Sequence, residues 1–313
     1  MRSFRLIPDE TRISFVGYRY WAYAFSGALV LLTLILLPTK GLNLGIDFQG
    51  GILIEVGMPG PAADLAAMRS TLQDLGLGEI ALQEFGEPTN VLIRIERQAG
   101  GEAGQLAAVE QVKAALAQRF GDDVSYRRVE FVGPKVSEDL LWAGTQATVY
   151  ALVAILVYVW FRFEWQFAVG AVVALMHDAV TTLGLFALFG LEFNLTSIAA
   201  ILTIIGYSIN DTVVIYDRVR ENLRKYKAMP LPDLIDRSVN ETLARTVMTS
   251  LTTLLALLAL AIFGGPVIRG FTIAMIWGVV IGSYSTVYVA SPMVLHLNLR
   301  REPAAQPAET AGE

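Results

Sequence analysis

Six long blocks of apolar residues alternate with polar segments along the chain. The blocks cover approximately residues 21–38, 141–161, 166–189, 195–216, 243–264 and 267–295. A bilayer core of roughly 30 Å takes about 20 apolar residues as a helix. Each block is close to or above that length, so the pattern predicts an α-helical polytopic membrane protein with six transmembrane helices.

The polar segment between the first two blocks is long enough to form a domain of its own. Gly residues follow each helix-like stretch, and residues 91–95 alternate as a half-buried strand does. The order strand–helix–strand–strand–helix–strand is that of an α+β ferredoxin-like domain. Its expected elements are strands 48–58, 79–86, 90–96 and 124–132 and helices 61–75 and 103–120.

Composition agrees with a membrane protein and excludes several function classes. Hydrophobic residues make up 54% of the 313 residues and charged residues 17%. Soluble domains have about 45–50% hydrophobic and about 25% charged residues. This excludes a wholly soluble enzyme. The chain has no cysteine and two histidines, so we expect no metal and no bound cofactor. A net charge of −5 gives no reason to expect a nucleic-acid partner.

Charge asymmetry predicts how the spans are oriented. Lys and Arg gather in residues 1–20, in a basic loop at 217–242 and after the last span, whereas the short loops on the other side hold only Glu192 and Arg269. The positive-inside rule therefore places both termini in the cytoplasm and segment 39–140 outside it.

Three further segments have their own expectations. The basic stretch 218–240 is compatible with binding to anionic membrane lipid and equally with a solvated loop. Residues 300–313, rich in Pro, Ala and Glu, are expected to be disordered. No small-residue cleavage site follows the first block, which predicts an uncleaved first span, with residues 141–299 holding spans two to six.

Charged residues inside the spans are the strongest indication of a functional site. Asp211 lies within span four, Arg245 near the start of span five and Asp178 midway along span three. An ionised side chain in hydrocarbon costs several kcal/mol, so each is a functional candidate. Asp178 is the less certain carboxylate, because a bond to a neighbouring Ser or Thr would explain it equally well.

Spans four and five each carry one polar stripe. At 100° per residue, the members fall within arcs of about 100° and about 120°. Asp211 and Arg245 lie at similar depth, which favours an Asp–Arg pair across the helix interface. The supporting residues of the two stripes are Thr203, Tyr207 and Asn210, and Thr242, Thr246 and Thr249.

Two interpretations of these stripes stay open. One is a fixed structural ion pair with hydroxyls joining the helices. The other is a proton site, because separating a buried carboxylate from a guanidinium favours proton uptake and bringing them together favours release. In that second interpretation Arg245, which stays charged, acts as an electrostatic gate.

Two other patterns in the spans have simple structural explanations. Span six has a small residue at every fourth position from Gly270 to Ala290, which favours close helix packing and implies a partner helix. Gly206-Tyr207-Ser208 superficially matches an intramembrane serine protease. Ser208 lies roughly 20 Å deep with no evident base, so this is a coincidence of spacing.

Three motifs resemble the SecD/SecF family. They are Gly45-Ile46-Asp47-Phe48-Gln49-Gly50-Gly51 after span one, the run from Gly206 to Asn222, and the run from Asn240 to Thr246. The resemblance covers nearly all of residues 1–300. The long span-four motif and the short outside domain favour the SecF branch over the SecD branch.

The resemblance implies half of a resistance-nodulation-division type membrane fold, the other half being SecD. It implies a subunit beside the SecYEG channel of the bacterial inner membrane that uses the proton-motive force, with protons as the coupling ion, to complete preprotein export. YajC and YidC are also associated in that family. Segment 39–140 would then be periplasmic. Asp211 and Arg245 match the family's proton-relay residues.

Some alternatives remain. The motif residues Gly45, Asp47, Gly50 and Gly51 suggest a role at the outer mouth, but Asp47 is equally explained as a capping residue. The whole chain is also compatible with a proton-coupled half-transporter for a lipid or drug, or with a structural scaffold that stabilises the channel.

Overall fold

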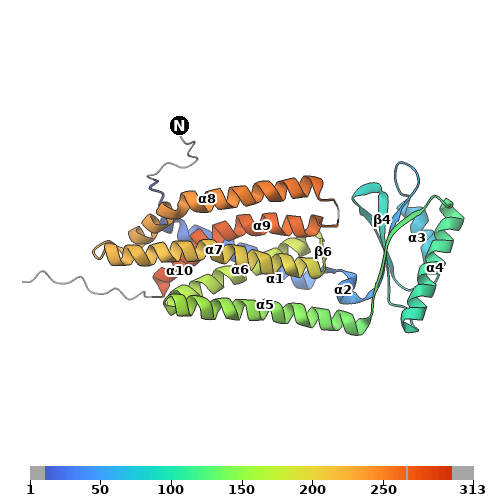
Figure 1. The fold of residues 1–313 in the computed structure, drawn as a ribbon, viewed down its shortest axis with the longest axis horizontal. Helices are drawn as coiled ribbons and strands as arrows, with labels where there is room; N and C mark the ends of the chain where they lie inside the picture. Colours follow the sequence, from blue (N-terminus) through green and yellow to red (C-terminus); the bar gives the residue numbers. More distant parts are fainter. Residues whose placement is uncertain (1–10, 266, 298–313) are drawn as a thin grey trace, which may run out of the picture.

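The protein is an elongated molecule with a helical bundle at one end and an α/β domain at the other (Figure 1). The computed structural model describes residues 11–265 and 267–297, so the tail 300–313 that the sequence predicts as disordered lies outside the described residues. The described chain starts and ends at the far end of the bundle from the α/β domain. This arrangement agrees with two termini on one side of a membrane.

Six helices of the bundle are long and apolar enough to cross a membrane, which confirms the predicted fold class. The last of them passes through a short π-helix, η2, before it ends. The helices are α1 (Arg19–Thr39), α5 (Pro134–Arg162), α6 (Trp165–Phe189), α7 (Leu195–Lys225), α8 (Leu231–Phe263) and α9 (Arg269–Ser285), which continues as η2 (Thr286–Ala290) and α10 (Ser291–His296).

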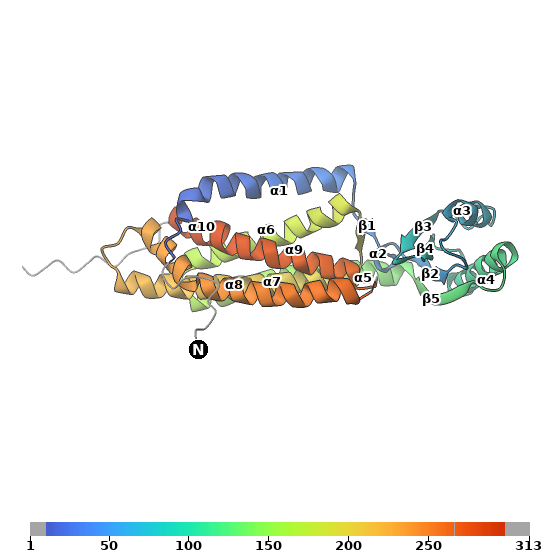
Figure 2. The same cartoon turned by 90° about the horizontal axis from the view of Figure 1, so that it is seen from above.

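The bundle has a central layer and an outer layer. Roughly half of the residues in the α6, α7 and α9 spans are buried by the chain itself, against fewer than one in five in α1, α5 and α8. Figure 2 shows α1 on one side of the bundle, with α6 and α9 between it and α8. The intramembrane polar residues therefore lie on helices that pack against one another.

The α/β domain lies between α1 and α5 and has the predicted βαββαβ order. Its four strands form one antiparallel sheet in the order β3-β4-β2-β5, and its two helices pack on the sheet around buried Ile, Val, Leu and Met side chains. This is the ferredoxin-like topology. The elements are β2 (Gly51–Gly57), α3 (Leu65–Gln73), β3 (Ile80–Phe85), β4 (Glu87–Ile95), α4 (Gly101–Phe120) and β5 (Ser125–Val132).

The first predicted strand begins too early. Residues Ile46–Gln49 form a short helix, α2, and the strand starts only at Gly51. Gly50 and Gly51 have φ of +73° and +107°, a region that L side chains rarely adopt. The two glycines thus turn the chain from helix into sheet, a break that the apolar pattern of 48–58 conceals.

Helix covers most of the segment that sequence analysis treats as a basic loop, 217–242. Helix α7 runs on to Lys225 and α8 begins at Leu231, so only residues 226–230 connect them. Pro230 stands at the N-cap of α8, where its missing N–H costs nothing. Hydropathy does not reveal these charged helical turns at the ends of α7 and α8. Their charges stand at helical spacing, as in the pair Arg237–Glu241.

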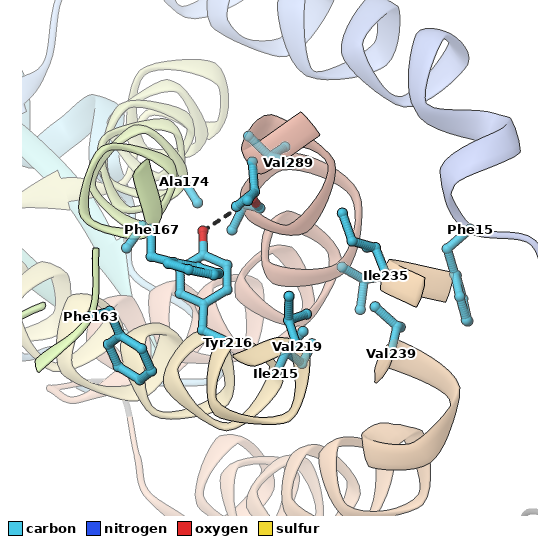
Figure 3. Close-up of a cluster of buried hydrophobic side chains, with 14 of the residues drawn as sticks. Phe15, Phe163, Phe167, Ala174, Ile215, Tyr216, Val219, Ile235, Val239 and Val289 are labelled. Carbon is cyan, nitrogen blue, oxygen red and sulfur yellow. Dashed lines mark hydrogen bonds between the residues drawn. The ribbon is translucent and has the colours of Figure 1, made fainter. Parts of the chain in front are cut away.

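The half of the bundle that lies farther from the α/β domain packs around a fully buried tyrosine (Figure 3). Tyr216 of α7 lies against Phe167 of α6, with ring centroids 4.8 Å apart, and its hydroxyl donates to the carbonyl of Ala290 at 3.0 Å. That carbonyl lies where the π-helix passes into α10. The buried tyrosine hydroxyl therefore has a backbone partner inside the bundle.

Candidate functional site

Asp211 is buried on α7 and has an unpartnered oxygen. The residue is 3% exposed, and its Oδ2 has no hydrogen-bond partner among the described residues. It lies 16 residues from the start of α7 at Leu195, about 24 Å along the helix. An orphaned carboxylate oxygen at that depth costs several kcal/mol, which favours a functional role over a purely structural one.

Asp211 faces α8 at the level of a second orphaned polar atom. The Tyr207 hydroxyl donates to Ser250 of α8 at 3.4 Å, and Ser250 in turn contacts Ser283 of α9 at 2.7 Å. One turn further along these antiparallel helices, Asp211 comes level with Thr246. The Thr246 hydroxyl is also buried without a partner among the described residues.

Arg245 does not contact Asp211. It is near enough to act on Asp211 electrostatically, but within the described chain the two make no hydrogen bond or ion pair. The Arg245 residue is exposed at the side of the bundle, one turn from Thr249, whose hydroxyl donates back to the Arg245 carbonyl. The sequence predicts the two charges at similar depth and favours a direct pair between them, but no such pair forms among the described residues.

The two predicted stripes divide into a buried and an exposed part. Thr242 is buried and bonds to its own helix at the Ser238 carbonyl. Thr203 and Asn210 are exposed on α7, and the Thr203 hydroxyl is satisfied by the Ala199 carbonyl. An amide and a guanidinium on the lateral surface of a membrane bundle are unfavourable against lipid. This surface is therefore one that another protein element would cover.

Asp178 belongs to a second buried polar cluster. It is fully buried, its Oδ2 accepts from Ser208 of α7 at 2.7 Å and from Ser285 of α9 at 2.8 Å, and its Oδ1 lies 3.0 Å from His177 Nδ1. Unlike Asp211, this carboxyl has a full set of partners from three helices. Sequence analysis anticipates a Ser or Thr neighbour for Asp178 but does not identify these two serines.

The small residues of span six pack against α7 of the same chain. A Cβ at Gly278 would overlap Ile204, and a Cβ at Gly282 would lie 3.2 Å from the Ser208 side chain. Thr286, at the next position, contacts the Thr212 hydroxyl at 2.9 Å. The partner helix that the stripe implies is therefore α7, and the close approach is what brings Ser285 to Asp178.

The protease-like serine has the wrong geometry for catalysis. Ser208 donates to the Asp178 carboxyl, while His177 approaches the other oxygen of that carboxyl. No base is placed to take the serine proton, since the imidazole and the hydroxyl are separated by the carboxyl group. Within residues 11–265 and 267–297, no three His, Cys, Asp or Glu side chains gather as a metal site would require.

The glycine-rich motif after α1 ties the α/β domain to α7; that domain, residues 51–132, is called the outer domain below because it lies outside the helical bundle. Strand β1 (Asn43–Leu44) pairs in parallel with β6 (Glu192–Phe193) just before α7, and the Gly45 amide donates to the Phe193 carbonyl at 2.8 Å. A Cβ at Gly45 would lie 2.8 Å from the Glu192 carboxylate. A side chain at this position would therefore displace the Glu192 carboxylate, which is the partner of Arg94.

Asp47 caps the helix that carries Asp211. Its Oδ2 accepts from the backbone N–H of Leu195, the first residue of α7, at 2.9 Å. A carboxylate at a helix N-terminus satisfies an orphan donor and complements the helix dipole. Arg94 of β4 adds a salt bridge to Glu192 and a hydrogen bond to Asn43 at 2.9 Å. We call residues 43–47 with residues 192–195 the strap.

The opposite end of α7 is held to α8 by a polar network. Asn222 donates to Ser238 at 3.0 Å and to Glu241 at 2.9 Å, and Glu241 also pairs with Arg218 and Arg237. Asn222 ends the α7 motif, and Glu241 lies at the start of the α8 motif. One continuous helix therefore joins the strap, Asp211 and this network.

Sequence analysis does not identify Ser285 as a site residue. Ser285 stands one position before Thr286 and so falls outside the stripe of small residues at every fourth position. On α7, Ser208 and Thr212 face α9, on a different side of the helix from the polar stripe toward α8. These two hydroxyl residues at helical spacing are the signal in the sequence for a polar contact with span six.

The fold and the site define the class of this chain. It is a multi-pass membrane protein with a six-helix bundle, a ferredoxin-like domain inserted after the first helix, and buried carboxyls on the central helices. A model of the family described as "Protein export membrane protein SecD/SecF, C-terminal" matches residues 111–300, and a model of the SecD/SecF GG motif matches residues 35–58.

Known proteins resemble the chain over nearly its whole length. The protein translocase subunit SecF of Rickettsia felis is 44% identical over 290 residues, which cover 93% of each chain, and that of Rhodobacter capsulatus is 46% identical over 309 residues, covering 95% of this chain and 92% of the relative. The crystal structure of SecDF, a translocon-associated membrane protein from Thermus thermophilus, matches with a TM-score of 0.84 at 35% identity over 94% of this chain.

A second structure, SecDF in a super-membrane-facing form, matches with a TM-score of 0.68 at 34% identity and covers 92% of this chain. The chain spans 40% of the first SecDF chain and 39% of the second. The protein belongs to the SecD/SecF family, which confirms the resemblance in the sequence motifs. With its six apolar helices, it is a multi-pass inner-membrane protein.

Proposed function

We propose that this chain is the SecF-type subunit of a Sec protein translocase and that, with SecD, it uses the proton-motive force to drive late steps of preprotein export. Asp211 carries the proposal, as a buried carboxyl with an orphaned oxygen on the helix that the outer domain caps. Loading and unloading a proton there would change the charge inside the bundle.

Coupling would run along α7. When Asp211 is ionised, the buried charge favours an arrangement that brings it closer to Arg245 or to water; when it is protonated, that demand disappears. A proton crossing 100 mV releases about 2.3 kcal/mol, a bias of roughly fifty-fold between two arrangements. The strap would transmit a displacement of α7 to the outer domain, which would hold or pull emerging preprotein.

The exposed polar surface of α7 and α8 supports a paired half. Thr203, Asn210 and Arg245 lie on it, and a SecD half would shield these residues from lipid. The relatives suggest the same partner, since the matched SecDF chains are more than twice as long as this one. The SecYEG channel, YajC, YidC and preproteins are proposed as the wider set of partners. The orientation proposed is cytoplasmic termini with segment 39–140 in the periplasm.

The test measures preprotein export into inverted membrane vesicles with and without a proton gradient. Asp211→Asn and Arg245→Met should remove most of the gradient-dependent export while leaving the gradient-independent part. Asp217→Asn is the matched control, because Asp217 lies on the same helix but is exposed and pairs with Arg162 at 3.0 Å; it should retain gradient-dependent export.

Abundance of the chain and its co-purification with SecD are measured for each variant. Full gradient-dependent export by Asp211→Asn at normal abundance would contradict the proposal and favour a structural scaffold. Intact export combined with gradient-driven movement of a lipid or drug would favour a half-transporter.

A further inference from the structure

The cluster around Asp178 is separate from Asp211 and has features of a site that changes its proton content. We propose that His177 and Asp178 form a proton-binding site of their own, which takes up one proton at the imidazole and stores it on the carboxyl group. The proposal stands on the geometry of this cluster and does not depend on the export function.

The site is sealed inside the bundle at mid-depth. Asp178 stands 13 residues from the start of α6 and 11 from its end, about 20 Å and about 17 Å along the helix. It is fully buried and His177 is 7% exposed. Gly282 of α9 faces the cluster, and a Cβ there would press on Ser208, lying 3.2 Å from that side chain.

The hydroxyls of the cluster can satisfy either protonation state of the carboxyl. Ser285 has one proton and two acceptors in reach, Asp178 Oδ2 at 2.8 Å and its own-helix carbonyl of Gly282 at 3.1 Å. With the carboxyl ionised, Ser285 donates to it. With Oδ1 protonated and bonded to His177 Nδ1, Oδ2 is a neutral carbonyl oxygen that keeps the bond from Ser208, and Ser285 can donate to either of its two acceptors.

The cluster therefore accommodates both protonation states of the carboxyl. The two states differ by one proton, and neither leaves the carboxyl or Ser285 without a partner. Ser208 keeps its 2.7 Å contact with Oδ2 in both. Because an unsatisfied buried polar group costs about 1–3 kcal/mol, a site that avoids this cost in both states can load and unload a proton cheaply.

The charged groups around His177 and Asp178 also favour a bound proton. No Lys or Arg in the described chain lies at ion-pair distance from His177 or Asp178; their ionic partners are each other. Facing them, α9 contributes Tyr284, whose ring lies 6.3 Å from the imidazole, α7 contributes Asp211 three residues from Ser208, and α1 contributes Ser26 through Tyr284. Helix α1 carries no charged residue after Arg19. The charged residues of α5 lie in its first two turns and at its last residue: Lys135, Glu138, Asp139 and Arg162.

In the absence of a fixed cation, the pair is electrically neutral only when it holds one extra proton relative to an ionised Asp beside a neutral His. The entry point is His177 Nε2, which is buried without a partner among the described residues. A proton that binds Nε2 makes an imidazolium, and the Nδ1 proton then passes 3.0 Å to Asp178 Oδ1. The product is a neutral acid beside a neutral imidazole of the other tautomer.

The experiment is infrared difference spectroscopy of the purified full chain in an alkyl maltoside, a detergent without a carbonyl group. Spectra recorded across a pH titration detect the carbonyl stretch of a protonated carboxyl in apolar surroundings. The wild-type chain should show a band that appears on acidification and is lost in Asp178→Asn. Asp211→Asn should leave that band in place.

Ser285→Ala provides an arm that keeps the carboxyl. Removing the hydroxyl changes the hydrogen bond to the acid, so the same band should remain and shift in frequency. Thermal unfolding shows which variants are folded, and if Asp178→Asn is not, the Ser285→Ala shift decides. A wild-type chain without such a band, a band that persists in a folded chain carrying both Asp178→Asn and Asp211→Asn, or a band unmoved in Ser285→Ala would each overturn the proposal.

Discussion

Removing the side chain of Asp47 should loosen the strap without unfolding either half of the molecule. Asp47 accepts one backbone hydrogen bond, from Leu195 at 2.9 Å, at the N-terminus of a 31-residue helix. An N-cap is worth about 0.5–2 kcal/mol, and an anion near a helix N-terminus about 0.3–1 kcal/mol. Asn194 already forms a capping box there, so we expect Asp47→Ala to lower the stability of the closed strap by about 1 kcal/mol, near the middle of the N-cap range.

A cost of about 1 kcal/mol corresponds to a roughly fivefold rise in the population of the open strap. Hydrogen–deuterium exchange measures this opening. The reporter is the Gly45 amide, which donates to the Phe193 carbonyl and does not touch Asp47. Its exchange should accelerate by about that factor in Asp47→Ala.

Asp64→Ala is the matched control for this measurement. Asp64 also caps a helix in the outer domain, accepting from Ala66 and Ala67 at the start of α3, and it is not part of the strap. That variant should accelerate exchange in α3 and leave Gly45 unchanged. Unchanged Gly45 exchange in Asp47→Ala, or equal acceleration in both variants, would refute the assignment of Asp47 as the residue that holds α7 to the outer domain.

Two packing substitutions should lower thermal stability in detergent. Gly278→Ala should cost about 1–3 kcal/mol of stability, because its Cβ would overlap buried Ile204. Gly270→Ala in the same stripe should cost little, because the nearest atom to a Cβ there is 3.9 Å away. Equal melting temperatures of these two variants would contradict the prediction. Tyr216→Phe should cost about 0.5–1.5 kcal/mol by removing the hydrogen bond to the Ala290 carbonyl, and a melting temperature equal to that of the unmodified chain would show that the π-helix does not need the hydroxyl.

The sequence predicts the fold well where one physical signal dominates. Long apolar runs locate the spans, and alternation with well-placed glycines locates the strands of the outer domain. The errors arise where two signals conflict. Apolar Phe48 is buried in a helix rather than a strand, because the backbone freedom of Gly50 and Gly51 decides the local structure and side-chain hydropathy does not.

The site is only partly predictable for a related reason. The cost of a charge in a membrane identifies Asp178 and Asp211 without a structure. Which hydroxyls surround each carboxyl depends on how α6, α7 and α9 rotate against one another, and on the extra residue in the turn of the π-helix. A single helical wheel contains neither piece of information, which is why Arg245 was expected in direct contact with Asp211.

The strap also determines where this protein can be divided. Residues 43–47 follow α1 in the chain, yet their hydrogen bonds go to the entrance of α7. A recombinant outer domain that began right after α1 would carry an unpaired strand and a free carboxylate, and the remaining bundle would lose the Asp47 cap on α7. The natural limits of a separable outer domain are therefore Gly50 and Gly133, and the motif between α1 and Gly50 belongs structurally to the membrane half.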